Sequence, residues 1–430
     1  MVQVLILFGL AAINRELVLT IAFRPSSNST SFNAYPMRSR DMCVWLTRAC
    51  SIRNRTLVSR IRRKKTLATR SPWQKQRRVV EAVGSLDVEE WKNDPEDQNN
   101  CGAKLDRQDD RIKYEEEFVV SPRGLKLFTC RWLPANREPK ALVFLCHGYA
   151  MECSVYMRGT GTKLVKAGFA VHGIDYEGHG KSDGLQGYVP SFDRLVDDCL
   201  HHFMSICEKP ENKKKKRFLY GESMGGAVAL TLHKNAPVYW NGAVLVAPMC
   251  KIADEMRPHP VVIKLLTKLS HVIPTWRIIP IQDIVDAAHK SPKKREEIRS
   301  NPLCYKGRPR LKTALELFLV CSDIENNFHE VSLPFLIAQG GDDIVTDPHI
   351  SKLLFDLASS KDKSFKLYPG MWHALTSAEP PESINLVFAD IFSWLDERAV
   401  TEEEDFEFGK RLNPENISIV DEGKMIALST

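Results

Sequence analysis

Residues 218–226 have the sequence Phe-Leu-Tyr-Gly-Glu-Ser-Met-Gly-Gly, and this stretch decides the fold. The apolar run 218–220 predicts a short buried strand, and the small residues of 225–233 predict a helix. Between them, residues 221–225 match the pattern Gly-x-Ser-x-Gly, in which a serine stands on a sharp turn from strand to helix. Glycines on both sides avoid clashes and let the hydroxyl project above the sheet. This context predicts that Ser223 is a nucleophile.

The rest of the body alternates between strand and helix patterns. Two short runs, 118–120 and 125–131, flank a Pro-Gly turn and predict a β-hairpin. Further buried strands are expected at 141–146, 170–174, 218–220, 243–247, 335–338 and 365–368, and helices at 160–167, 192–207, 225–233 and 350–358. This order predicts an α/β protein, a mostly parallel sheet with helices on both faces. In such sheets the chemistry lies at the carboxyl ends of the strands.

A serine hydroxyl needs a base to become nucleophilic, and in this fold class the chain order is serine, acid, histidine. His373 follows the last expected strand, 365–368, which is where the base should lie. His329 and His349 are rivals, but the first falls in an insertion and the second at a helix start. The sequence therefore predicts His373 as the base.

The acid should follow the preceding strand, 335–338. Three aspartates lie there: Asp342, Asp343 and Asp347. Asp347 directly precedes a proline and is expected to cap the next helix. Asp342 is expected to be solvated. Position along the chain does not by itself choose among the three.

The transition state of acyl transfer also needs hydrogen-bond donors for its oxyanion. One is expected to be the backbone N–H of Met224, next to the nucleophile, and the other that of Tyr149, in the loop after strand 141–146. His147 begins the same loop and is expected to brace it. Neither a metal nor a cofactor is needed for this chemistry.

The turn-rich stretch 175–183 follows another expected strand and contains His179 and Asp183. In an acyltransferase, a histidine and an aspartate at this spacing could act together as the catalytic base. The favoured interpretation is a rigid loop that borders the pocket.

About 85 residues separate the strand at 243–247 from the strand at 335–338, far more than one crossover helix needs. We expect an inserted helical cap at about 250–332. Six apolar residues within it share one helical face: Val262, Leu265, Leu266, Leu269, Val272 and Ile273. The favoured interpretation is that this face packs on the core. The alternative is a lid that lines an acyl tunnel or makes a peripheral membrane contact.

The charge of the chain is unevenly distributed. Residues 1–80 contain 16 Lys or Arg and two acids, a net charge of +14, so the other 350 residues sum to −8 against the total of +6. The acidic body indicates no nucleic-acid partner. The run 213–217 is basic and is expected to be a solvated loop, with a membrane contact as the alternative. Residues 400–430 are expected to form an acidic tail.

The basic leader, 1–100 with its linker, is rich in Arg and Ser and poor in acids, which is typical of an organelle transit peptide. A chloroplast destination is the favoured interpretation. A signal or membrane-associated leader and a misassigned start are the alternatives, which would leave the protein membrane-associated or cytoplasmic. No run of 18 apolar residues predicts a spanning helix.

The eleven cysteines are scattered, and no Cys-x-x-Cys occurs. This spacing argues against a zinc site and against a disulfide framework, and favours reduced, mostly buried thiols.

Taken together, these motifs resemble the monoacylglycerol lipase family of α/β-hydrolases. The plant branch, with caffeoylshikimate esterases and lysophospholipases, is the nearest in pattern. The resemblance spans about residues 112–397 and rests on 147–148, 175–183, 221–226 and 368–373. It implies an α/β-hydrolase fold with an inserted cap, an ester as substrate and no cofactor.

The family's catalytic positions fall on residues of this chain. The resemblance implies Ser223 as nucleophile, His373 as base, and Asp343 as acid, because the family's acid lies in a Gly-x-x-Asp pattern. The oxyanion donors fall on Tyr149 and Met224. Two departures occur: alanine follows Tyr149 where relatives usually have glycine, and the acid segment has Gly-Gly-Asp-Asp where relatives often have His-Gly-Glu-Asp.

The predicted function is therefore hydrolysis of a monoacylglycerol or a similar lipid or phenolic ester through a Ser-His-Asp triad and an acyl-enzyme. An acyltransferase with the same acyl-enzyme is one alternative. A ligand-binding receptor on the same fold is another, and repeated turnover at Ser223 would distinguish the enzyme from it. The oligomeric state and the preferred acyl chain are left open.

Overall fold

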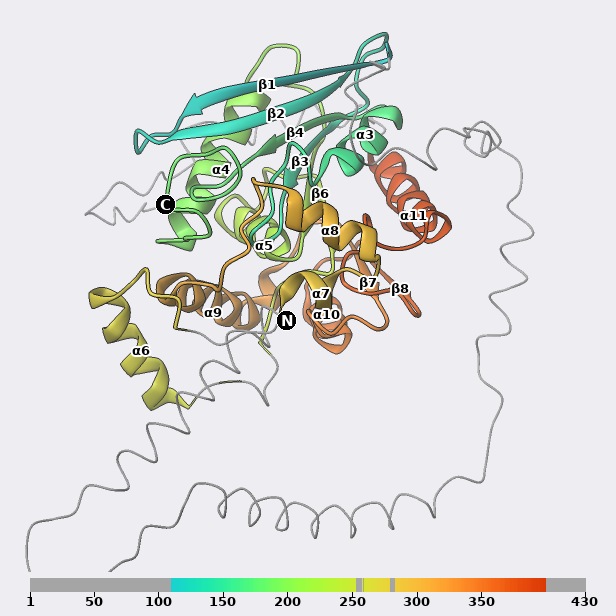
Figure 1. The fold of residues 1–430 in the computed structure, drawn as a ribbon. Coiled ribbons are helices and arrows are strands. Elements are labelled where there is room, and N and C mark those ends of the chain that lie inside the picture. Colours follow the sequence, from blue (N-terminus) through green and yellow to red (C-terminus); the bar gives the residue numbers. More distant parts are fainter. Residues whose placement is uncertain (1–109, 253–256, 258, 279–282, 400–430) are drawn as a thin grey trace, which may run out of the picture. The chain divides into compact units, whose positions relative to one another are not determined.

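The computed structural model describes residues 110–252, 257, 259–278 and 283–399 (Figure 1). Its centre is an eight-stranded sheet in the order β1-β2-β4-β3-β5-β6-β7-β8. The strands are β1 (Ile112–Val120), β2 (Lys126–Pro134), β3 (Leu142–Cys146), β4 (Ala170–Ile174), β5 (Arg217–Glu222), β6 (Gly242–Val246), β7 (Phe335–Gly340) and β8 (Lys363–Tyr368). β1 and β2 form an antiparallel hairpin, β2 pairs antiparallel with β4, and every pair from β4 to β8 is parallel.

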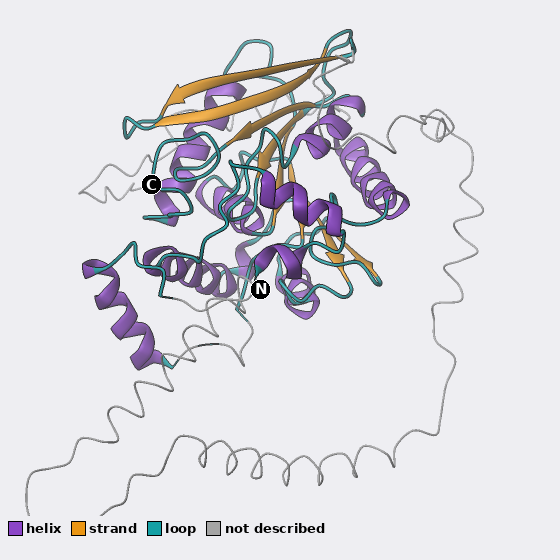
Figure 2. Cartoon of the chain, in the orientation of Figure 1, coloured by secondary structure: helices purple, strands orange, loops and turns teal. Residues whose placement is uncertain are grey.

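Helices cover both faces of the sheet (Figure 2). One face is packed by α4 (Phe192–Cys207), α5 (Met224–Asn235) and α10 (Pro348–Leu357), and the other by α3 (Arg158–Lys166) and α11 (Pro381–Ala399). Because both faces are covered, β3, β5 and β6 are buried along their whole length, and this explains their continuous apolar runs. The predicted α/β architecture is confirmed.

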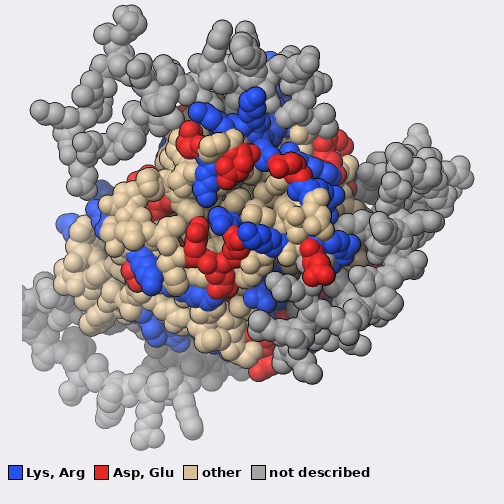
Figure 3. Space-filling view, turned by 90° about the horizontal axis from the view of Figure 1, so that it is seen from above, with Lys and Arg blue, Asp and Glu red and all other residues tan. Residues whose placement is uncertain are grey.

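β1 lies at one edge of the sheet, and its pattern differs from that of the central strands. It carries Glu115, Glu116 and Glu117, which form ion pairs with neighbours such as Arg131 and Lys181. Figure 3 shows positive and negative side chains interspersed on the face of the described region that it views. Charged residues on an edge strand discourage pairing with another chain.

The segment between β6 and β7 contains α6 (Pro260–Val272), α7 (Ile284–Ala288), α8 (Pro292–Ser300), α9 (Leu311–Asn326) and the short 3-10 helix η5 (Phe328–Glu330). α6 packs on α9 and lies at the periphery of the fold (Figure 1). Of the helices in the described part of the chain, none is both long and apolar enough to cross a membrane.

Most predicted elements were found within a few residues of their expected bounds. β1 begins at Ile112, well before the expected 118, because its charged residues hid the strand pattern. α11 was not predicted, and neither was the division of the cap into separate helices. The leader and its linker to residue 109 and the acidic tail lie outside the described residues, so the predictions for them stay predictions. The eight cysteines within the described region are all free and buried, as expected.

The strand–helix turn after β5 depends on close packing at Gly225. A Cβ atom added there would lie 1.8 Å from the backbone oxygen of Cys146 in β3, so no side chain fits. Gly159, by contrast, is an exposed helical glycine of α3, and a Cβ added there would meet nothing within 4 Å.

This contrast predicts opposite effects of the same substitution. Gly225→Ala should push α5 away from β3 and leave little folded protein. Gly159→Ala should raise the free energy of unfolding by up to about 1 kcal/mol, because alanine favours the helix. Thermal unfolding and soluble yield measure both effects. A Gly225→Ala variant that melts like the unmodified protein would contradict this account of the turn.

Candidate active site

Ser223 occupies the turn between β5 and α5 in a strained backbone conformation. Its φ is 55° and its ψ is −116°, a region that residues with a side chain rarely adopt. Three hydrogen bonds hold it there. Its N–H donates to the Val246 oxygen of β6 (3.0 Å), and its own carbonyl accepts from Gly226 (2.9 Å) and Met249 (2.9 Å). The neighbouring strand and helix therefore present the serine at the carboxyl end of the sheet.

Asp343 lies in the loop after β7, and its buried carboxylate accepts five hydrogen bonds. Oδ1 accepts from the backbone N–H groups of Val345 (2.7 Å) and Thr346 (3.0 Å). Oδ2 accepts from the Thr346 hydroxyl (2.8 Å), the Gln339 amide (2.9 Å) and His373 Nδ1 (2.9 Å). A carboxylate with this many donors is held in one orientation, aimed at the histidine.

His373 follows β8 and receives its orientation from Asp343. Burial alone would raise the pKa of Asp343, but the charge and hydrogen bond of His373 and the donors of Thr346 outweigh it and lower the pKa. The lowered pKa of Asp343 therefore adds stability above pH 3.8, the ordinary value, and this contribution is lost as the pH falls through the lowered pKa. Among the described residues, no hydrogen bond joins the Ser223 hydroxyl to His373. In ligand-free enzymes this contact is often long and tightens when substrate binds.

The rival residues lie elsewhere or have other tasks. Asp342 is exposed, and Asp347 caps α10 by accepting from the N–H of His349 (2.8 Å). His329 belongs to η5. The structure thus brings Asp343 and His373 together, whereas Asp342, Asp347 and His329 are not part of this pair.

The loop that carries Tyr149 lies against the nucleophile. A Cβ atom built on Gly148 would be 3.5 Å from the Ser223 Cβ. Tyr149 is buried, and its hydroxyl donates to the Gly187 carbonyl (2.8 Å), which anchors the loop. Ala150 has a φ of 68°, so the alanine that replaces the family's usual glycine occupies a left-handed conformation. Met224 begins α5, where backbone N–H groups have no intrahelical acceptor.

Glu152 fixes the far end of this loop, and sequence reasoning missed it. Its buried carboxylate accepts from the N–H groups of Val155 (2.9 Å) and Tyr156 (2.6 Å), the Ser154 hydroxyl (2.8 Å) and the Asn301 amide (3.1 Å). The last bond ties the loop to the cap. A charged residue within an apolar stretch was the only signal that could have identified it.

His147 braces the loop, as predicted. Its ring stacks on Tyr176 at 3.9 Å between centroids, and its Nε2 accepts from the Tyr176 N–H (3.3 Å). Burial and the nearby His179 lower its pKa well below 6.5, so it is neutral. Burial likewise lowers the pKa of His179 to about 4.

The stretch 175–183 is a hydrogen-bonded turn. Asp175 accepts from the N–H groups of Cys153 (2.8 Å) and Lys181 (2.9 Å), which connects the turn to the Tyr149 loop. Asp183 accepts instead from the N–H of Lys126 in β2 (2.8 Å). His179 and Asp183 thus have separate partners, which supports the rigid loop and not the acyltransferase pair.

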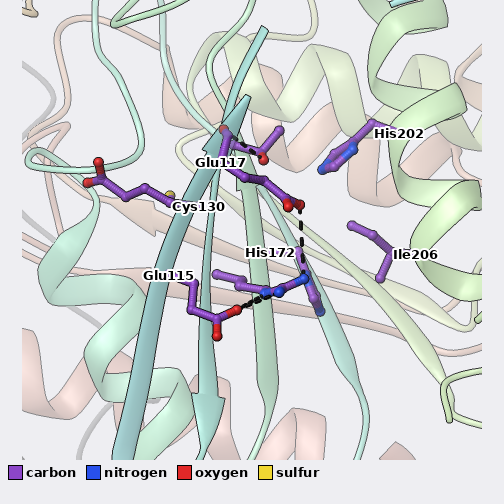
Figure 4. Close-up of a pocket in the computed structure, with 9 residues that line it drawn as sticks. Glu115, Glu117, Cys130, His172, His202 and Ile206 are labelled. Atoms are coloured by element: carbon purple, nitrogen blue, oxygen red, sulfur yellow. Dashed lines mark hydrogen bonds and ion pairs between the residues drawn. The ribbon is translucent and has the colours of Figure 1, made fainter. Parts of the chain in front are cut away.

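A cavity of about 270 Å³ lies between the β1–β2–β4 part of the sheet and α4 (Figure 4). Glu115 and Glu117 line it and both contact Arg131. Burial lowers the pKa of its two histidines, His172 to about 3 and His202 to about 4. None of the predicted catalytic residues lines this cavity, so it is separate from the candidate active site.

An eight-stranded sheet with a strained serine after β5 and a hydrogen-bonded Asp-His pair after β7 and β8 defines the class: an α/β-hydrolase of the serine type. The family Hydrolase_4, described as "Serine aminopeptidase, S33", matches residues 137–381. The chain belongs to the monoacylglycerol lipase-like α/β-hydrolases and is a carboxylic ester hydrolase of the lipase or esterase type.

Individual relatives support this placement. A caffeoylshikimate esterase of Arabidopsis thaliana is 35% identical over 289 residues, 67% of this chain and 86% of that protein. The human monoglyceride lipase is 31% identical over 291 residues, 67% of this chain and 93% of that protein. In fold, the chain is similar to a monoglyceride lipase from Saccharomyces cerevisiae solved with a substrate analog, with a TM-score of 0.58 and 22% sequence identity. This similarity covers 70% of this chain and 99% of the yeast chain.

The three competing aspartates allow a direct test of the acid. Asp343→Asn should lower kcat on the order of 10⁴-fold, because the amide cannot hold the productive tautomer of His373. Asp342→Asn makes the same chemical change at an exposed position and should leave ester hydrolysis nearly unchanged. Asp347→Asn should retain activity and lose about 0.3–1 kcal/mol of stability, because the amide can still cap α10 but the negative charge at the helix N-terminus is removed. Steady-state kinetics on a soluble ester measures all three. A larger loss of kcat in Asp347→Asn than in Asp343→Asn would reject Asp343 as the acid.

Proposed function

We propose that this protein hydrolyses a monoacylglycerol or a similar lipid or phenolic ester, with Ser223, His373 and Asp343 as its catalytic triad. The observation that carries the proposal is the Asp343–His373 hydrogen bond of 2.9 Å, at the same end of the sheet as a strained serine. The relatives named monoglyceride lipase and caffeoylshikimate esterase support both substrate types.

In the proposed reaction, His373 removes the proton of the Ser223 hydroxyl as its oxygen attacks the ester carbonyl carbon. The carbonyl oxygen becomes an oxyanion, which the backbone N–H groups of Met224 and Tyr149 stabilise. His373 then gives the proton to the leaving alcohol, and an acyl-enzyme remains. Water, deprotonated by the same histidine, attacks the acyl-enzyme and releases the acid and free Ser223. Asp343 stabilises the imidazolium of His373 in both acylation and deacylation.

A fluorophosphonate probe tests the nucleophile. We expect it to label the protein at Ser223, and we expect both labelling and ester hydrolysis to disappear in Ser223→Ala. Loss of such a nucleophile costs roughly 10⁴-fold or more in turnover. Ser205→Ala changes an exposed serine of α4 and serves as the control. Near-normal hydrolysis by Ser223→Ala would refute the proposed triad. A panel of monoacylglycerols, lysophospholipids and phenolic esters then identifies the preferred substrate.

The cap gives a further proposal about how a lipid substrate reaches the site. The predicted stripe of α6 divides in the structure: Val262 and Leu266 are buried in the core, and Leu269 and Ile273 pack partly against it. For these four residues the favoured core interpretation is supported. Leu265 and Val272 are instead exposed and lie with Val261 on another side of the helix.

The exposed side of α6 has the composition of an interfacial helix. Val261 is 66% exposed, Leu265 39% and Val272 77%, and Trp276, just after the helix, is 58% exposed. The exposed lysines Lys264 and Lys268 flank these apolar side chains. Apolar residues beside lysines favour binding to an anionic lipid surface, and we propose that α6 makes this contact.

Vesicles test the proposed contact. Val272→Ser with Trp276→Ser should weaken binding to vesicles of mixed neutral and anionic phospholipid, and should slow hydrolysis of long-chain monoacylglycerol in those vesicles. Hydrolysis of a soluble butyrate ester should not change. Leu266→Ala, in the core, should lower the free energy of unfolding by about 2–5 kcal/mol and reduce both activities together. Unchanged vesicle binding by the surface variant would exclude α6 as the lipid contact.

A further inference from the structure

Glu222 stands directly before the nucleophile, and its side chain is buried beside the candidate active site. It is 8% exposed. Its Oε1 accepts two hydrogen bonds, from the Tyr220 hydroxyl (2.9 Å) and the Thr376 hydroxyl (2.8 Å). Both donors are buried as well, so these bonds are shielded from water. The triad described above does not use this carboxyl group.

The two donors come from different parts of the fold. Tyr220 belongs to β5, the strand that also contains Glu222. Thr376 lies three residues after His373, on the loop that carries the base. The hydrogen bond from Thr376 therefore joins the base loop to the residue next to Ser223. It is a direct connection between the turn of the nucleophile and the loop of the base.

The same loop is held from its other side by the cap. The N–H of Ala374 donates to Ala288 (3.1 Å), and the N–H of Ser291 donates to Ala378 (3.2 Å). Lys290 Nζ donates to the Gly370 carbonyl (2.9 Å). These bonds fix the outer side of the loop that carries His373. On the side that faces the sheet, the hydrogen bond from Thr376 to Glu222 holds the same loop.

Charge also connects Glu222 with the base. Burial raises the pKa of Glu222, and the hydrogen bonds of Thr376 and Tyr220 and the charge of His373 oppose this shift. Two further groups face it, the Tyr156 phenol and, more weakly, the Lys294 ammonium of α8. When Glu222 is ionised, it stabilises the imidazolium that forms on His373 during acylation and deacylation.

We propose that Glu222 is a positioning residue for His373: it holds the base loop to the nucleophile turn through Thr376, and its ionised form is the active one. This inference rests on the proposed function. It assigns to the second residue of the Gly-x-Ser-x-Gly pattern a task that the pattern itself does not require.

Glu222→Gln separates the charge from the shape. The amide keeps the size of the side chain and an oxygen that can accept from Thr376 and Tyr220. We expect kcat/KM to fall about tenfold at pH 8, which corresponds to about 1.4 kcal/mol of transition-state stabilisation. The ratio of unmodified to variant kcat/KM should grow as the pH rises through the ionisation of Glu222. The acidic limb of the variant's profile should lie at lower pH, because its base loses an attractive charge.

Stability distinguishes this role from a structural one. Because burial raises the pKa of Glu222, its ionisation destabilises the folded state as the pH rises. Glu222→Gln should therefore melt at the same or a higher temperature at pH 8 while it turns over more slowly. The role of the charge would be overturned if the melting temperature fell along with activity. It would also be overturned if kcat/KM stayed within twofold of that of the unmodified protein and the pH profile did not shift.

Two matched variants test the connection through Thr376. Thr376→Val and Tyr220→Phe each remove one hydroxyl donor to the same oxygen, but only the first touches the base loop. We expect Thr376→Val to lower kcat by a larger factor than Tyr220→Phe. In the double variant Thr376→Val/Glu222→Gln, we expect the loss of kcat to be smaller than the product of the losses in Thr376→Val and Glu222→Gln alone. Equal losses in the two hydroxyl variants would overturn the proposed connection. If the unmodified protein hydrolyses no ester of the panel and Ser223 is not labelled, the proposed function itself fails.

Discussion

The close approach of α5 to β3 is the constraint on which the site depends. At Gly225 the helix passes so near to the Cys146 carbonyl that a methyl group has no room. This contact forces the chain to turn sharply between β5 and α5, so Ser223 takes a left-handed backbone conformation. The same turn places Met224 at the first position of α5, where backbone N–H groups have no intrahelical acceptor. Strain at Ser223 persists because strands and helix on every side hold it.

Two buried carboxyl groups, those of Asp343 and Glu222, interact with His373, and their surroundings shift their pKa values in opposite directions. Asp343 accepts five hydrogen bonds, and its pKa is lowered despite burial. Glu222 accepts two hydrogen bonds from hydroxyl groups, and its pKa is raised. The charge of His373 and the hydrogen bonds therefore favour the ionised form of Asp343, which orients His373. Burial favours the protonated form of Glu222.

The cap contacts each loop that carries a candidate catalytic residue from outside the β5–α5 turn. Backbone hydrogen bonds from the segment around α7 and α8 hold the base loop, and Asn301 holds Glu152 behind the Tyr149 loop. Val345, beside the acid, packs against Ala288 of α7. A movement of this segment would therefore reach His373, Asp343 and the Tyr149 loop together. α6 is different, because one side of it packs on the core and the other is exposed.

The sequence alone determined the sheet, the nucleophile turn and the position of His373, because strand periodicity and the Gly-x-Ser-x-Gly pattern are local signals. It left three aspartates open, and the family resemblance, not spacing, selected Asp343. Only the tertiary structure revealed that Gln339 and Thr346 orient this acid, that Glu152 holds a loop and that Glu222 contacts Thr376. It also divided the apolar stripe of α6 into core and surface. These contacts join residues from separate elements, and no local pattern encodes a pairing that arises only when the elements pack together.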